Sequence, residues 1–140
     1  MFDETKKYKT QGHFFFQKGN NLKEQSRNVP VPELPGVYYI LRLAKGNVDL
    51  VYIGKSGTIL QSGKFKKQLL NVGATLVVAL LPQQKYFEQK MADENIDGLD
   101  IYWFVTMDKH NNDLPGYAEG ILMQRYFDVH GKLPPWNNEF

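Results

Sequence analysis

The sequence predicts an α+β fold in which a small, mainly antiparallel sheet of three β-strands is flanked by helices. Three observations indicate this fold. Residues 36–54 contain two runs rich in β-branched and aromatic residues on either side of a short polar turn, which is typical of a β-hairpin. Residues 99–106 form a third run of this kind and are assigned to the strand beside the hairpin. Residues 83–95 and 115–130 have apolar residues at helical spacing.

Residues 1–35 are predicted to be an N-terminal extension ahead of the domain at residues 36–140. The run of residues 13–17 is rich in phenylalanine and lies between glycines, so we expect it to pack on the domain as a short strand. Base stacking by these phenylalanines is the weaker alternative. Residues 18–35 are polar and end in a proline-rich stretch, which predicts an extended lead-in and excludes a helix.

Period-2 alternation in the hairpin places its tyrosines. In the first strand Tyr38 shares a face with Arg42, and in the second Tyr52 shares a face with Leu50 and Gly54. Both phenol rings are therefore expected to project to the same side of one sheet.

Composition restricts the classes of function. The chain has 140 residues, enough for one domain, and no cysteine, which excludes disulfides and cysteine-bound zinc. Its start lacks a charged-then-apolar secretion signal, so a cytoplasmic protein that does not enter a membrane is expected. Residues 1–70 contain 12 Lys and Arg against 5 Asp and Glu. This basic half, which includes the hairpin, suits a phosphate-bearing partner, and a solvated lysine-rich surface is the simpler alternative.

The segment after the hairpin is harder to assign. Ser62 is expected to cap a short helix over residues 64–70, with Lys64 and Lys67 on a face next to its apolar side. Residues 69–81 form an uncharged apolar run that is too short and too interrupted to span a membrane. We interpret this run as buried core, and a patch that forms a homodimer is the alternative.

The helix at residues 115–130 contains one acidic residue of interest. Glu119 shares helical spacing with Leu122 and Tyr126 of the apolar stripe, which places its carboxylate at the edge of the buried face. An acidic residue near the start of a helix also interacts favourably with the helix dipole, and this is the purely structural alternative.

Four features together resemble the GIY-YIG nuclease family. Residues 36–38 read Gly-Val-Tyr and residues 52–54 read Tyr-Ile-Gly, although the first has valine for isoleucine and the spacer is longer than usual in the family. Glu119 then stands near the start of a helix after the third strand, and Asn137 follows a proline after that helix. The resemblance covers residues 36–138. It implies a metal-dependent endonuclease of restriction or repair type that hydrolyses phosphodiester bonds of nucleic acid, with DNA as the expected partner.

The resemblance also implies roles for these residues. Glu119 would be the sole protein ligand of Mg²⁺ or Mn²⁺, with water and substrate phosphate completing the coordination. Tyr38 or Tyr52 would act as general base or orient the attacking water. Asn137 would bind phosphate or fix the packing of the sheet against the helix.

One departure from the family weakens the expectation of catalysis. The family carries an arginine that contacts the scissile phosphate in the helix after the second tripeptide, but no arginine occurs between Arg42 and Arg125. Lys64 is the candidate substitute, and Lys55, Lys67 and Arg42 are candidate phosphate contacts. Because lysine lacks the bidentate geometry of arginine, an impaired nuclease is expected. The alternative is an inactive domain that binds nucleic acid or a protein partner.

Overall fold

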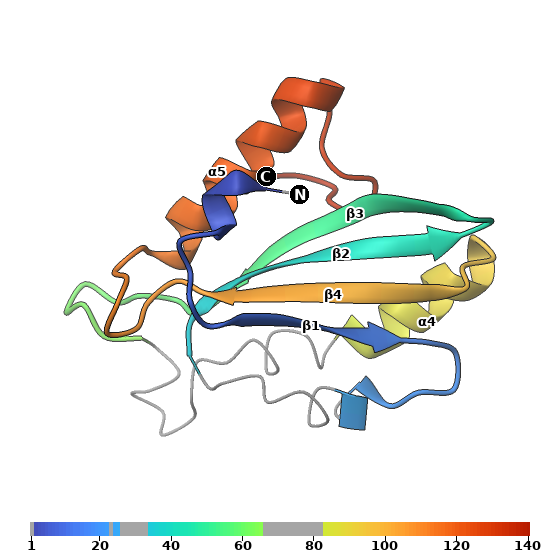
Figure 1. The fold of residues 1–140 in the computed structure, drawn as a ribbon, viewed down its shortest axis with the longest axis horizontal. Coiled ribbons are helices and arrows are strands. Elements are labelled where there is room, and N and C mark those ends of the chain that lie inside the picture. The colour runs from blue at the N-terminus through green and yellow to red at the C-terminus, as the bar shows by residue number, and fades with distance from the viewer. Residues whose placement is uncertain (1, 23, 26–33, 66–82) are drawn as a thin grey trace.

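The computed structural model describes residues 2–22, 24–25, 34–65 and 83–140. It shows an α+β fold built on one antiparallel sheet of four strands in the order β1-β4-β2-β3 (Figure 1). The elements in chain order are η1 (Asp3–Thr5), β1 (Gln11–Phe16), β2 (Gly36–Ala44), β3 (Asn47–Ser56), α4 (Gln84–Asp93), β4 (Gly98–Val105) and α5 (Pro115–His130).

The hairpin and the third strand are confirmed, but the sheet has four strands instead of three. β2 pairs with β3 and also with β4, and β1 pairs with the other edge of β4. Phe14 and Phe16 of β1 are buried in the core, while His13 and Phe15 face the opposite side. This alternation makes β1 a strand with one apolar face, so the aromatic part of the N-terminal extension belongs to the sheet.

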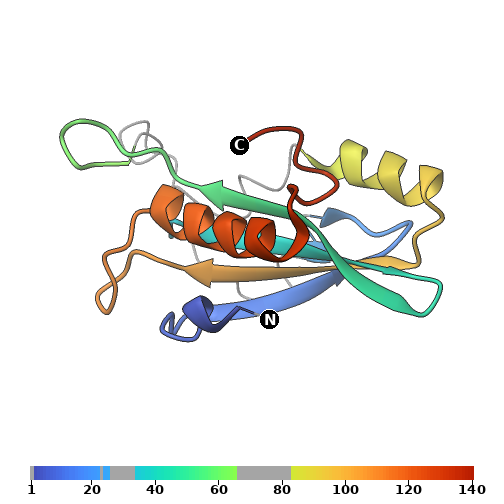
Figure 2. The ribbon, with the colours of Figure 1, turned by 90° about the horizontal axis from the view of Figure 1, so that it is seen from above.

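The two helices cover opposite faces of the sheet, and both predictions of a helix are confirmed. Phe87 and Met91 of α4 pack in one core cluster with Tyr38. Leu122 of α5 packs in the other core cluster with Tyr39, and Figure 2 shows α5 lying along the sheet. Neither helix is long and apolar enough to cross a membrane, and the same holds for every helix in the described residues.

A β-bulge corrects the expected arrangement of the second hairpin strand. Leu41 pairs with Leu50 while Ile40 pairs with Tyr52, so Val51 is an extra residue without a partner in this register. The expectation that Leu50 shares a face with Tyr52 is therefore wrong. Leu50 packs in the cluster beneath α5, whereas Tyr52 packs against the cluster beneath α4.

Residues 57–65 form a tight turn, so the helix expected at residue 64 does not begin there. Ile59 and Phe65 pair in an isolated β-bridge, and the N–H of Leu60 donates to the carbonyl of Lys64 at 2.8 Å. Gly63 has φ of +86°, a left-handed conformation that ends a regular helix. The remainder of the predicted helix and the apolar run at residues 69–81 lie outside the described residues.

Gly36 lies too close to the backbone of β4 to carry a side chain. A Cβ atom at this position would lie 2.0 Å from the carbonyl oxygen of Phe104 on β4. We expect Gly36→Ala to lower the free energy of unfolding by about 3 kcal/mol, because the backbone of β2 or β4 must shift. Urea denaturation measures the change.

Gly116→Ala in α5 is the matched control, since a Cβ atom at residue 116 would meet no heavy atom of another segment within 4 Å. Alanine favours helix over glycine, so this variant should be unchanged or stabilised by less than about 1 kcal/mol. Equal destabilisation by the two substitutions would contradict the steric argument.

Candidate functional site

The structure brings the two tyrosines of the hairpin together. The rings of Tyr38 on β2 and Tyr52 on β3 have centroids 5.9 Å apart and planes inclined by 32°. Tyr38 is 3% exposed, whereas Tyr52 is half-buried. The interaction between the two hydroxyl groups raises the pKa of Tyr38 and opposes the rise of the pKa of Tyr52. The inner phenol thus lies directly beside the outer one.

Gly54 makes room for this pair of rings. It lies opposite Tyr38 in the β2–β3 ladder. A Cβ atom at Gly54 would lie 2.6 Å from the hydroxyl oxygen of Tyr38 and 2.8 Å from Cε1 of Tyr52. The rings therefore occupy the space in which any other residue would place its side chain. This is the physical reason why a glycine stands two residues after Tyr52.

Glu119 on α5 is the third member of the cluster. Its side chain is half-buried, and its negative charge raises the pKa of both Tyr38 and Tyr52. Burial raises the pKa of the Glu119 carboxyl group above its usual value, and the positive charge of Lys55 on β3 counteracts this shift in part. A carboxylate that is partly desolvated beside two phenols is an arrangement typical of functional sites.

The electrostatics of the cluster keep both phenols protonated. Burial raises the pKa of Tyr38 well above 10.0, and the coupling with Tyr52 and with Glu119 adds to the shift. Burial also raises the pKa of Tyr52, although the interaction with the hydroxyl group of Tyr38 opposes the change. A phenolate is therefore unfavourable at neutral pH. The arrangement supports orientation of a water molecule by the hydroxyl groups more than removal of its proton by a phenolate.

The predicted lysines differ in their relation to the cluster. Lys55 is exposed on β3, and its charge acts on Glu119. Lys64 is exposed in the turn after β3, and no contact joins it to Glu119 or the tyrosines among the described residues. Lys67 lies outside the described residues.

Arg42 is placed away from the tyrosines, at the other end of the hairpin. Its guanidinium group forms ion pairs with Asp49 of β3 and Glu94 after α4. Arg42 stands four positions after Tyr38 on β2, which corresponds to roughly 13 Å along a strand. Arg42 therefore joins the hairpin to α4, and the structure does not bring this predicted phosphate contact to the cluster.

Asn137 binds the protein backbone. Its side-chain oxygen accepts from the N–H of Ile53 at 3.0 Å, and its side-chain nitrogen donates to the carbonyl of Ile53 at 3.0 Å. The N–H of Trp136 donates to the carbonyl of Val51 at 2.8 Å. The C-terminal segment thus pairs with β3 at the edge of the sheet. Asn137 was expected to bind phosphate or to fix the sheet against the helix, whereas its amide group holds the C-terminal segment on β3, which makes it a positioning residue.

A polar hollow beside Tyr52 was not foreseen from the sequence. It lies between β3, the start of α4 and the C-terminal segment, which are far apart along the chain, so no local pattern marks it. Its lining residues are Tyr52, Gln83, Tyr86, Trp136, Asn137, Asn138 and Glu139.

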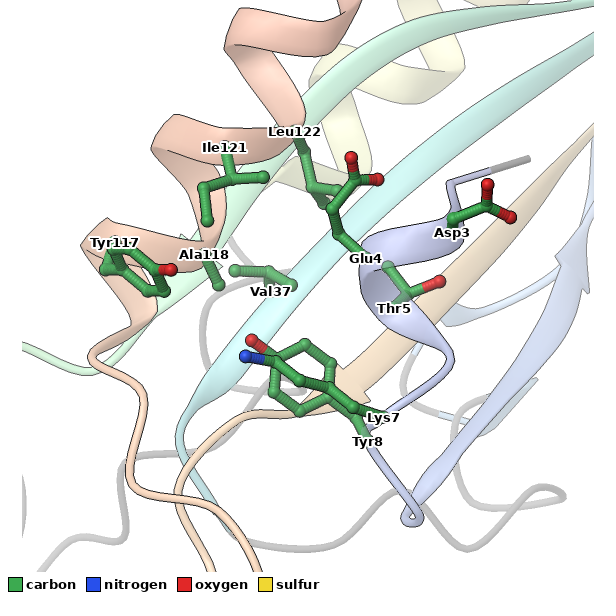
Figure 3. Close-up of a pocket in the computed structure, with 10 residues that line it drawn as sticks. All are labelled: Asp3, Glu4, Thr5, Lys7, Tyr8, Val37, Tyr117, Ala118, Ile121 and Leu122. Carbon is green, nitrogen blue, oxygen red and sulfur yellow. The ribbon is translucent and has the colours of Figure 1, made fainter.

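Figure 3 shows another cavity, which lies between η1 and α5 and includes none of the predicted site residues. Val37, Ala118 and Leu122 form its apolar wall. At its rim Lys7 pairs with Asp113, and the hydroxyl of Tyr8 donates to the same carboxylate at 2.7 Å. These rim contacts attach the N-terminal residues to the loop before α5, so this cavity has a structural explanation.

The cluster offers one carboxylate to a metal ion. No group of three histidine, cysteine, aspartate or glutamate residues gathers in the part of the chain that the structure describes. Glu119 is nevertheless a suitable single ligand for a hard divalent ion, because a cation would offset the charge that burial disfavours. Water and a phosphate oxygen of the substrate would have to supply the other ligands.

The fold and site define an α+β domain in which two tyrosines of the hairpin lie side by side and a glutamate of α5 acts on both through its charge. Comparisons with models of protein families, with curated proteins and with solved structures found no match.

Asn137→Ala tests the attachment of the C-terminal segment. Loss of two hydrogen bonds to Ile53 should lower the free energy of unfolding by about 1–3 kcal/mol. Hydrogen exchange at the Ile53 amide should accelerate, because its acceptor is removed. Asn138→Ala, at the neighbouring position, is the control. If Ile53 exchanges equally fast in both variants, the pairing with Asn137 is refuted.

Glu119→Gln tests the desolvation of the carboxyl group. Since the folded state raises the pKa of Glu119, the folded protein binds this proton more tightly than the unfolded chain. The free energy of unfolding therefore falls as the pH rises from about 4.5 through the folded pKa. Glutamine avoids this loss, so the variant should melt at a higher temperature than the wild type near neutral pH, with a smaller difference in acid.

The control is Glu88→Gln on the exposed side of α4. Thermal melts across this pH range should show a pH-dependent difference for the substitution at Glu119 and none for that at Glu88. A difference in melting temperature for Glu119→Gln that does not change with pH would refute the raised pKa of the Glu119 carboxyl group.

Proposed function

We propose that this chain is a GIY-YIG-like domain that acts as a metal-dependent endonuclease on nucleic acid, with DNA as the expected substrate. The observation that carries the proposal is the contact between Tyr38 of β2 and Tyr52 of β3, together with the effect of the Glu119 charge on the pKa of both phenols. Gly36 and Gly54 are also sterically required, so all four outer residues of the two tripeptides have a structural reason. The sequence resemblance and the geometry thus point to the same residues.

The proposed mechanism assigns Glu119 to hold Mg²⁺ or Mn²⁺. The metal, when bound, would supply positive charge for the phosphoryl oxygens and make a bound water easier to ionise. Tyr52, half-buried and packed beside the ring of Tyr38, orients the attacking water through its hydroxyl group. Tyr38 fixes the position of Tyr52 from within the core. Lys55 contributes positive charge beside Glu119 at the surface where the phosphate would approach.

A domain that binds nucleic acid or a protein without cleavage is the second candidate. Two observations favour it. Arg42 is held in ion pairs at the far end of the hairpin, and Asn137 uses its amide group on the backbone of β3. The guanidinium group of Arg42 and the amide group of Asn137 are therefore engaged in contacts other than phosphate binding. Loss of one charged contact to a transition state costs about two to three decades in rate, which gives a slow enzyme.

A cleavage assay separates the two candidates. Supercoiled plasmid incubated with Mg²⁺ or Mn²⁺ should be nicked by the wild type. Glu119→Ala should reduce the rate at least about 100-fold, because the metal ligand is removed. Tyr52→Phe should reduce it to a smaller extent, since the ring is retained and only the hydroxyl group is lost. Glu88→Ala, at an exposed position on α4, should leave the rate unchanged.

Two other outcomes of this assay would refute the nuclease. Salt-sensitive binding of nucleic acid without metal-dependent cleavage would support the second candidate and refute the nuclease. Absence of both binding and cleavage would refute a role in nucleic-acid chemistry and leave a protein partner.

A further inference from the structure

The hollow beside Tyr52 is contiguous with the candidate site, and the inference drawn from it rests on the proposed function. Tyr52 is a member of both, because it lines the hollow and its ring centroid lies 5.9 Å from that of Tyr38. The C-terminal segment that lines the hollow continues towards α5, where the ring of Phe140 would lie 4.0 Å from a Cβ at Gly120. Gly120 is the immediate neighbour of Glu119. A nucleotide at the cluster would therefore have this hollow next to it.

Two aromatic residues form a firm wall of the hollow. The ring of Tyr86 is 37% exposed and meets the ring of Trp136 edge-on, with centroids 5.9 Å apart. Trp136 is stacked on Phe87 at 6.1 Å, and its indole N–H donates to Glu94 at 3.1 Å. These contacts fix the indole ring before any ligand arrives. Trp136 is itself 3% exposed, so Tyr86 presents the accessible part of this wall, and Trp136 supports it from behind. A fixed aromatic surface binds a planar ligand at little entropic cost.

The polar lining of the hollow selects against phosphate. Its charged lining residue is Glu139, a carboxylate that repels anions. Gln83 and Asn138 contribute amide groups, each with a donor and an acceptor, whereas the amide group of Asn137 is committed to Ile53. A ligand suited to this lining is planar, uncharged and bears donors and acceptors along one edge. A nucleobase has these properties.

We propose that the hollow binds a nucleobase next to the phosphate that the cluster engages, and that it prefers a base with an exocyclic amino group, such as cytosine or adenine. The carboxylate of Glu139 accepts a hydrogen bond from that amino group. The aromatic wall contacts the face or edge of the ring. The base must be unpaired, because stacking and pairing in a duplex occupy both its face and its edge. The substrate class is therefore single-stranded or locally unpaired nucleic acid.

The test measures binding without cleavage. Fluorescently labelled oligo(dC), oligo(dT) and an abasic deoxyribose-phosphate oligomer of equal length are titrated with the wild-type protein in EDTA. Oligo(dC) should bind about 5- to 100-fold more tightly than the abasic oligomer, as expected from one stacked base. It should also quench tryptophan emission, because Trp136 lines the hollow. Oligo(dT) should bind less tightly than oligo(dC).

Matched variants test whether the difference in affinity between oligo(dC) and the abasic oligomer arises in the hollow. Tyr86→Ala should remove the advantage of oligo(dC) over the abasic oligomer, and Tyr86→Phe should retain it, since the ring remains. Both substitutions are at an exposed position, so folding should be preserved. Glu139→Gln should reduce the preference for oligo(dC) over oligo(dT). Equal affinity for the abasic oligomer and oligo(dC), or no binding of any oligomer at low salt, would overturn the base site.

The base site and the nuclease can fail separately. Base-dependent binding by a wild-type protein that does not cleave would support the hollow and refute the nuclease. Metal-dependent cleavage without any preference for a base over the abasic oligomer would support the nuclease and refute the hollow.

Discussion

The close contact of Gly54 with the rings of Tyr38 and Tyr52 is the constraint on which the candidate site depends. The rings lie where a Cβ atom of residue 54 would be, so the two phenols pack against the backbone of β3. This packing buries Tyr38 and places its ring beside that of Tyr52, and burial raises the pKa of both phenols. Glu119 then lies beside phenols that are already desolvated. The arrangement of the two phenols thus depends on the absence of a side chain at residue 54.

The charges of the domain are distributed unevenly around this site. At the far end of the hairpin, Arg42 is neutralised by Asp49 and Glu94, and the indole of Trp136 bonds to Glu94 as well. These contacts hold the hairpin, α4 and the C-terminal segment in one frame. Glu119 has a different environment, in which burial disfavours its charge and Lys55 compensates only in part. Proteins keep a carboxylate whose charged form is disfavoured by burial mainly where function requires it, and the surrounding structure supplies the stability that such a group costs.

Much of the fold was predictable because its signals are local. Runs of β-branched and aromatic residues indicate β2, β3 and β4, while Pro115 and Gly131 mark the start and end of α5. The pairing of the tyrosines followed from the period-2 alternation of the hairpin. The bulge at Val51 was not predictable, since a register shift depends on which residues of the partner strand pack best. A turn with Gly63 in a left-handed conformation replaced an expected helix, and Phe65 at the end of this turn is buried beside Gly57 of the same loop.

The linear order of residues was therefore sufficient to predict the hairpin, the third strand and the two helices, because periodicity, glycines and prolines act over a few residues. The sequence resemblance to a nuclease family made the tyrosines and Glu119 candidates. Contacts between distant segments settled the remainder. They assigned β1 to the sheet, bound Asn137 to β3, directed Arg42 away from the cluster and formed the hollow beside Tyr52. Burial, pKa shifts and shape arise from neighbours far away along the chain, so no local pattern of residues could specify them.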